Sequence, residues 1–101
     1  MPARTIEFLY DFGSPASYIA HCRLQGVAAR TGATVAHVPI LLGGVFKATG
    51  NSAPGTVPAK GRHMGIDLLR FAARDGVPFV MNPHFPINTM PLMRLAAALQ
   101  D

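Results

Sequence analysis

Cysteine is nearly absent from this sequence, and its scarcity excludes two classes of site. Cys22 is the only cysteine among the 101 residues, so no intramolecular disulfide can form and thiol-rich metal sites are excluded. The four histidines show no short-range spacing of the kind that paired metal ligands have: His21, His37, His63 and His84. We therefore predict no metal centre, and we expect a reducing compartment.

Charged residues are also scarce. They make up only 14% of the chain, with nine basic and five acidic residues, for a formal net charge of +4. The basic residues run from Arg4 to Arg94 without forming a patch, which disfavours nucleic-acid binding, whereas a mild positive excess suits a small anionic ligand. No stretch approaches the roughly 18 uninterrupted apolar residues of a membrane span, and the N-terminus lacks the features of a signal peptide. These absences predict a cytoplasmic protein that binds neither a membrane nor nucleic acid.

The first forty residues carry the pattern of a βαβ unit. Residues 5–12 alternate apolar side chains at period two, which predicts a strand. Ser14 is a favoured helix N-cap, Pro15 is a favoured first helical residue, and Gly32 is a favoured stop, so a helix is expected between them. The β-branched run at 34–38 predicts a second strand, parallel to the first because such crossovers are right-handed in nearly all cases.

The remaining residues predict a long loop and two helices. Residues 43–58 are rich in glycine and proline and are expected to form the loop, and residues 76–86 are expected to be irregular. One helix is predicted over 59–75, and a second begins near Asn88 or Thr89. Their expected inward residues are Met64, Leu68, Leu69, Phe71 and Ala72 in the first helix, and Met93, Leu95, Ala96 and Leu99 in the second.

Ser14 is the candidate functional residue. A strand that ends in Gly-Ser-Pro at a helix start directs a hydroxyl and free amide N–H groups at one point, where the helix dipole also favours negative charge. Thioredoxin-like folds place the reactive cysteine of a Cys-x-x-Cys motif there, and this chain has Ser14-Pro15-Ala16-Ser17 instead. A serine cannot exchange disulfides, but its hydroxyl can donate to a thiolate that a ligand supplies.

Simpler interpretations exist for these residues. Ser-Pro is a common helix cap, and Ser14 needs no other role to explain its presence. Serine hydrolysis is disfavoured because the G-x-S-x-G elbow is absent. The polar residues around the glycine-rich segment, Lys47, Asn51 and Lys60, would ordinarily be solvated surface.

A resemblance adds a specific hypothesis. The stretch EFLYDFGSPASYIA, then LLGGVFKATGN, then Pro-Ala-Lys-Gly and a helix containing Asp-Leu-Leu-Arg-Phe resemble the 2-hydroxychromene-2-carboxylate isomerase family. That family is similar to the kappa-class glutathione transferases, and both have the DsbA-like thioredoxin fold with a helical insertion. The resemblance implies an α/β fold that divides into a thioredoxin-like βαβ unit (1–42), a glycine- and proline-rich ligand loop (43–58) and an incomplete helical insertion (59–101).

The resemblance also implies a cofactor and site residues. Glutathione would be the cofactor of an isomerase that interconverts 2-hydroxychromene-2-carboxylate and trans-o-hydroxybenzylidenepyruvate in naphthalene-type aromatic degradation. Ser14 would be the catalytic residue that hydrogen-bonds the glutathione thiolate, Asn51 and Lys60 would contact the polar groups of glutathione, and Lys47 would bind the small anionic aromatic substrate. A kappa-like glutathione transferase and a non-catalytic, glutathione-binding or chain-pairing fragment are the alternatives.

The resemblance finally implies a shortened protein. Family members run to roughly twice this length, so the chain is expected to correspond to their N-terminal half. Half of its residues are hydrophobic, and two parallel strands leave hydrogen-bonding edges open. We therefore expect a homo-oligomer, or pairing with a separate C-terminal half.

Overall fold

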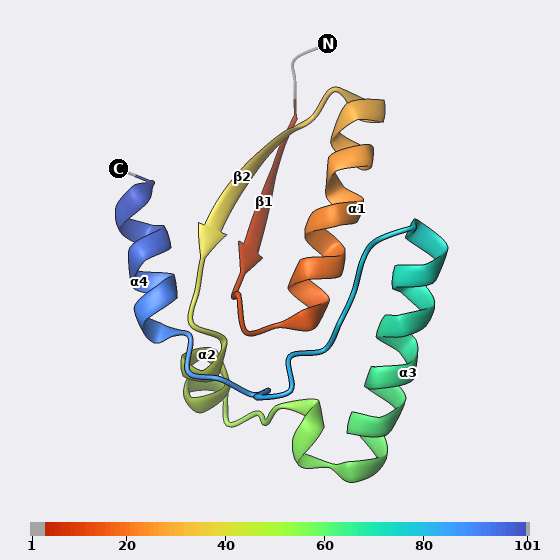
Figure 1. The fold of residues 1–101 in the computed structure, drawn as a ribbon. Helices are drawn as coiled ribbons and strands as arrows, with labels where there is room; N and C mark the ends of the chain where they lie inside the picture. The colour runs from red at the N-terminus through yellow and green to blue at the C-terminus, as the bar shows by residue number, and fades with distance from the viewer. Residues whose placement is uncertain (1–3, 101) are drawn as a thin grey trace.

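A pair of parallel strands joined by a helix forms the centre of the computed structural model, which describes residues 4–100. β1 (Thr5–Tyr10) lies beside β2 (Thr34–Pro39), and α1 (Pro15–Thr31) connects them. The pairing runs in register from Thr5 opposite Thr34 to Tyr10 opposite Pro39. Both strands therefore end at the same end of the molecule, near α2 (Figure 1). The predicted βαβ unit is confirmed, although β1 stops two residues earlier than expected.

The two ends of α1 have the predicted caps. The backbone of Ser14 is extended, with φ −96° and ψ 113°, and its Oγ accepts a hydrogen bond of 3.1 Å from the Ser17 N–H. Gly32 ends the helix in the left-handed conformation, with φ 70°. This conformation strains residues that carry a Cβ, so the glycine explains the position of the stop.

Three further α-helices follow the βαβ unit. They are α2 (Leu42–Thr49), α3 (Pro58–Asp75) and α4 (Met90–Leu99), and a short 3₁₀ turn, η1 (Pro54–Thr56), precedes α3. The prediction of a continuous loop over 43–58 is therefore wrong for the segment that α2 occupies. Two glycines in this helix lower its stability by about 1 kcal/mol each relative to alanine, but Asp11 accepts a hydrogen bond from the first amide of the helix, that of Leu42, and the left-handed Gly50 ends it. The predicted α3 and the irregular segment after it are confirmed.

The core lies between α1 and α3, which run side by side (Figure 1). Ile19 of α1 packs against Leu68 and Ala72 of α3, with Met64, Phe71 and Phe79 around them. Leu69 was expected to be inward but is 57% exposed. In α4 only Met93 is buried. Leu95 and Leu99 were expected to be inward but are exposed, because α4 packs through one narrow face.

The molecule is open for its size. Its accessible surface is 7401 Å², whereas a folded monomer of this mass exposes roughly 5,500 Å². Its radius of gyration is 15.0 Å, compared with about 13 Å for a compact domain of this length. Among residues 4–100, no helix is both long enough and apolar enough to cross a membrane. Many large apolar side chains are exposed, including Val80 at 92% and Leu99 at 77%, which identifies faces suited to further packing.

Candidate functional site

Asp11 follows β1 and is almost completely buried, with 4% of its surface exposed. Its Oδ1 accepts hydrogen bonds from the Gly13 N–H at 2.8 Å and the Thr89 hydroxyl at 2.6 Å, and its Oδ2 accepts one from the Leu42 N–H at 2.9 Å. Burial by itself raises the pKa of Asp11, but the bonds from Thr89, Gly13 and Leu42 together lower it below its ordinary value. Asp11 is therefore a buried carboxylate held in its charged form.

This one carboxylate connects the starts of three helices. Gly13 directly precedes the cap of α1, Leu42 is the first residue of α2, and Thr89 is the cap of α4. Each helix start carries partial positive charge, which favours a carboxylate beside it. Asp11 thus fixes the positions of α1, α2 and α4 relative to the end of β1.

The turn before α1 is packed tightly against α4. The Phe12 N–H donates to the Met93 Sδ at 3.3 Å, and the Ser14 N–H donates to the Asp11 carbonyl at 2.9 Å. A Cβ on Gly13 would lie 3.0 Å from the Thr89 Cγ2 and 3.3 Å from the Asp11 Oδ1. This close approach requires a glycine at position 13. The backbone conformation does not, because the φ of Gly13 is not positive.

A groove of about 980 Å³ opens at this end of the molecule. All four α-helices begin on it, because its walls include Ser14, Leu42, Val57 and Thr89, each at the start of a helix. None of the four helices has an acidic residue in its first turn. The dipoles of four helices therefore favour an anion in the same groove.

Ser14 presents a hydrogen-bond donor to this groove. Its oxygen is oriented by the Ser17 N–H, and within the described part of the chain its own hydroxyl hydrogen has no acceptor. The amide of Ala16, which also lines the groove, likewise has no acceptor among residues 4–100. A bound anion can thus accept from the hydroxyl and from a free helix amide.

The structure brings three of the four predicted site residues into the groove. Asn51 and Lys60 line it with Ser14. The Asn51 Oδ1 accepts from the Ser52 N–H at 2.8 Å, which leaves its NH₂ group to face a ligand, and Lys60 has no ion pair within residues 4–100. Lys47 is exposed on α2 and is not part of the wall, although Gly43, one helical turn before it, is. Lys47 therefore stands beside the groove.

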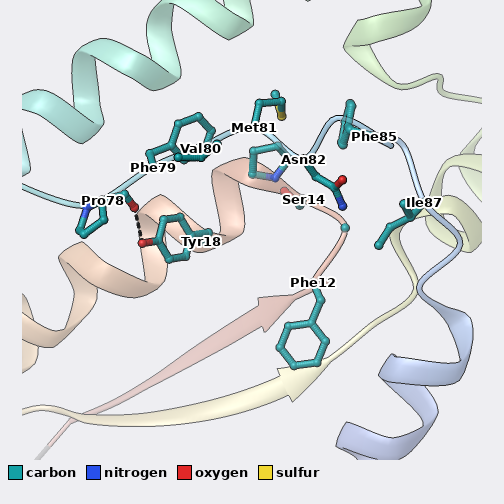
Figure 2. Close-up of a pocket in the computed structure, with 12 residues that line it drawn as sticks. Phe12, Ser14, Tyr18, Pro78, Phe79, Val80, Met81, Asn82, Phe85 and Ile87 are labelled. Atoms are coloured by element: carbon teal, nitrogen blue, oxygen red, sulfur yellow. Dashed lines mark hydrogen bonds between the residues drawn. The ribbon is translucent and has the colours of Figure 1, made fainter.

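Ser14 also borders two smaller cavities. One, of about 320 Å³, lies between the start of α1 and the irregular segment before α4, whose apolar side chains surround it (Figure 2). The Tyr18 hydroxyl donates to the Pro78 carbonyl at 2.5 Å and closes one side of it (Figure 2). The other, of about 350 Å³, lies between α1 and the two strands. Ser14 is thus the residue that all three spaces share.

Reasoning from the sequence missed Asp11 and Thr89. Asn88 or Thr89 was expected to cap α4. The Asn88 Oδ1 accepts from the Met90 N–H at 3.1 Å, whereas the Thr89 hydroxyl donates to Asp11. An aspartate two residues before a glycine is a turn signal that indicates the hydrogen bond from the Gly13 N–H to the Asp11 side chain. No local signal connects Asp11 with partners 31 and 78 residues away.

A family model for the DsbA-like thioredoxin domain matches residues 5–101. The chain belongs to the DsbA-like thioredoxin domain family. Among curated proteins, it is 36% identical over 100 residues to 2-hydroxychromene-2-carboxylate isomerase of Sphingobium xenophagum, covering 97% of this chain and 51% of that protein. It is 37% identical over 102 residues to glutathione S-transferase kappa 1 of Caenorhabditis elegans, covering 95% and 45%.

A solved structure agrees with this placement in the DsbA-like family. A 2-hydroxychromene-2-carboxylate isomerase superposes with a TM-score of 0.71 at 33% identity, covering 79% of this chain and 40% of that one. The resemblance inferred from the sequence is confirmed, as is the thioredoxin-like α/β fold. The chain spans about half the length of the curated relatives it matches, and those relatives are isomerases and transferases.

Proposed function

We propose that the groove binds glutathione, with its sulfur at Ser14, and that the protein uses it to isomerise 2-hydroxychromene-2-carboxylate. The observation that carries this proposal is the convergence of Ser14, Asn51 and Lys60 on one groove at which four helices begin. Glutathione has two carboxylates and becomes more negative when its thiol ionises. The groove supplies a lysine, an amide and several helix starts for these charges.

The roles of the three residues follow from their donors. The Ser14 hydroxyl and the Ala16 amide donate to the thiolate and favour the ionised sulfur. Lys60 pairs with one carboxylate of glutathione, and the Asn51 NH₂ group donates to another polar group of the tripeptide. The Asp11 carboxylate contributes negative charge nearby, which its three hydrogen bonds offset in part.

The reaction balances without an oxidant or a further reactant. When bound, glutathione would supply a thiolate that adds reversibly to the alkene of the ring-opened oxo acid, so that the bond could rotate before elimination restores the double bond and the thiolate. The Ser14 hydroxyl and the Ala16 amide would hold that sulfur in its ionised form. Such a step belongs to the degradation of naphthalene-type aromatics.

The test is the absorbance change on mixing the protein with 2-hydroxychromene-2-carboxylate, with and without glutathione. We expect Ser14→Ala to lower the glutathione-dependent rate about 10- to 1000-fold, as for loss of one donor to an anion. Ser14→Asp keeps an N-cap acceptor, so it should retain the melting temperature while its charge repels the thiolate. Thr49→Ala, which removes an exposed hydroxyl outside the wall of the groove, is the control and should leave the rate unchanged. An equal rate per folded molecule in Ser14→Ala would leave that residue only its capping role.

A transferase function is the second candidate, because kappa-class transferases match this chain as closely as the isomerases do. The two reactions differ in the fate of glutathione. An isomerase regenerates it, whereas a transferase consumes one glutathione for each conjugate formed. Thiol titration before and after many turnovers distinguishes them, and tight glutathione binding without either reaction would identify a non-catalytic binding protein.

A further inference from the structure

The cavity between α1 and the strands is lined by a cluster of four rings. Phe8 and Tyr10 of β1 have ring centroids 5.8 Å apart, and His37 of β2 lies 6.0 Å from each of them. His21 of α1 lies 5.7 Å from His37 and 6.4 Å from Phe8. These spacings are typical of attractive ring pairs, so the four rings form a wall suited to a flat ligand.

The two histidines in this wall have uncommitted polar atoms. Within residues 4–100, neither imidazole makes a hydrogen bond with another protein group. A neutral imidazole has one N–H donor and one acceptor nitrogen, and both nitrogens donate when it is protonated. A cavity lined by rings, with two adjacent donors, fits a planar aromatic molecule that bears a carboxylate.

We propose that this cavity binds the aromatic carboxylate co-substrate, with its carboxylate at His21 and His37 and its reactive end toward Ser14. This inference rests on the proposed function for the chemistry at Ser14. The cavity runs along α1 from Ser14 to His21, seven residues and about 10 Å of helix. Asp11 lines the Ser14 end. Its negative charge, together with that of the thiolate, repels a carboxylate from that end and leaves the histidine end for it.

The other candidate positions for this carboxylate lack a pair of adjacent ring donors. The cavity in Figure 2 has no charged residue and no histidine in its wall, its Tyr18 hydroxyl donates to the Pro78 carbonyl, and its uncommitted donors are the Asn82 NH₂ group and the Ser14 hydroxyl, which the proposed function assigns to the thiolate. Lys47 lines none of the three spaces that meet at Ser14. The geometry therefore favours the histidine pair over Lys47 as the carboxylate partner.

The test uses naphthalene-2-carboxylate, a flat aromatic acid that cannot add a thiol, and naphthalene-2-carboxamide as its uncharged control. Titration of the whole chain, followed by imidazole NMR signals, should shift His21 and His37 and leave His63 and His84 unchanged. His21→Phe and His37→Phe keep a ring and remove the donor, so each should weaken carboxylate binding about tenfold and leave the carboxamide unaffected. His63→Phe is the matched control.

Two outcomes would overturn the inference. One is unchanged affinity in both histidine variants, and the other is loss of carboxylate affinity in Lys47→Ala instead. The wild-type titration needs no variant, so a variant that fails to fold does not prevent a decision. Glutathione is absent from this experiment. If the protein binds glutathione but not naphthalene-2-carboxylate, only the assignment of this cavity is refuted. If it binds naphthalene-2-carboxylate at the two histidines but does not bind glutathione, only the proposed function is refuted.

Discussion

Replacing Asp11 by asparagine tests the central feature of the site. The side chain keeps its size and an oxygen that can accept from Gly13 and Thr89, but its NH₂ group then faces the N–H of Leu42. The change removes a hydrogen bond to a charged group, which costs about 1.5–3 kcal/mol, and leaves the partly buried Leu42 donor unpaired, which costs about 1–3 kcal/mol when burial is complete. We expect a destabilisation of about 3 kcal/mol, which lowers the melting temperature of a domain of this size by roughly 15 °C.

The effect of Asp11→Asn should depend on pH. The folded-state pKa of Asp11 lies below its ordinary value of 3.8, because its three donors outweigh its burial. The carboxylate therefore contributes its full stability above the unfolded-state pKa, and that contribution is lost as pH falls through the folded-state pKa. The difference between wild type and variant should be constant near pH 7 and should shrink in acid below about pH 4.

Thermal unfolding by circular dichroism between pH 2.5 and 7 measures this difference. Asp67→Asn is the control, because Asp67 forms no hydrogen bond or ion pair within the described residues, and its melting temperature should match the wild type. Equal melting temperatures for wild type and Asp11→Asn at pH 7 would refute the assigned role. So would a difference that persists undiminished in acid, because a purely steric defect has no reason to titrate.

Further expectations concern the lysines, the turn and the open surface. Lys60→Ala should raise the glutathione dissociation constant, whereas Lys47→Ala should leave it unchanged; calorimetry checks both, and no change in the first variant would make Lys60 a solvated surface residue. Gly13→Ala places a methyl group 3.0 Å from the Thr89 Cγ2 and should destabilise the fold by about 1–3 kcal/mol. Gly65→Ala, in a helix with nothing within 4 Å, should be neutral or stabilising, and denaturant titration compares the two. The exposed apolar surface should make the protein dimeric or larger in light scattering, or let it bind a C-terminal half from a relative, and a stable 10.7 kDa monomer indifferent to that half would contradict this.

Local sequence signals predicted the elements whose cause is local. Alternation gave β1, and the Ser14–Pro15 start and the Gly32 stop defined α1. The helix α2 was missed because glycines at 43 and 44 weaken its intrinsic preference, and its first amide is held by Asp11 from another part of the chain. Tertiary contacts of that kind override local propensity.

The candidate site divides in the same way. Ser14 was predictable because a cap and an anion site need the same residue at the same place. Asn51 and Lys60 were named by family resemblance, and only the structure shows that they share a groove with Ser14. The pairing of His21 with His37 required the crossover to bring a helix against a strand, which spacing along the chain does not reveal.

The contacts that hold α4 span most of the sequence. Thr89 reaches Asp11 across 78 residues, and Met93 reaches Phe12 across 81. Closing such long loops costs conformational entropy, so these contacts become favourable only after the intervening chain has folded. Amide protons of α4 should therefore exchange with solvent through local opening that leaves the α1–α3 core intact. Thr89, at the start of α4, forms part of the groove wall. The groove can therefore open and re-form around a ligand while the strands and α1 stay folded.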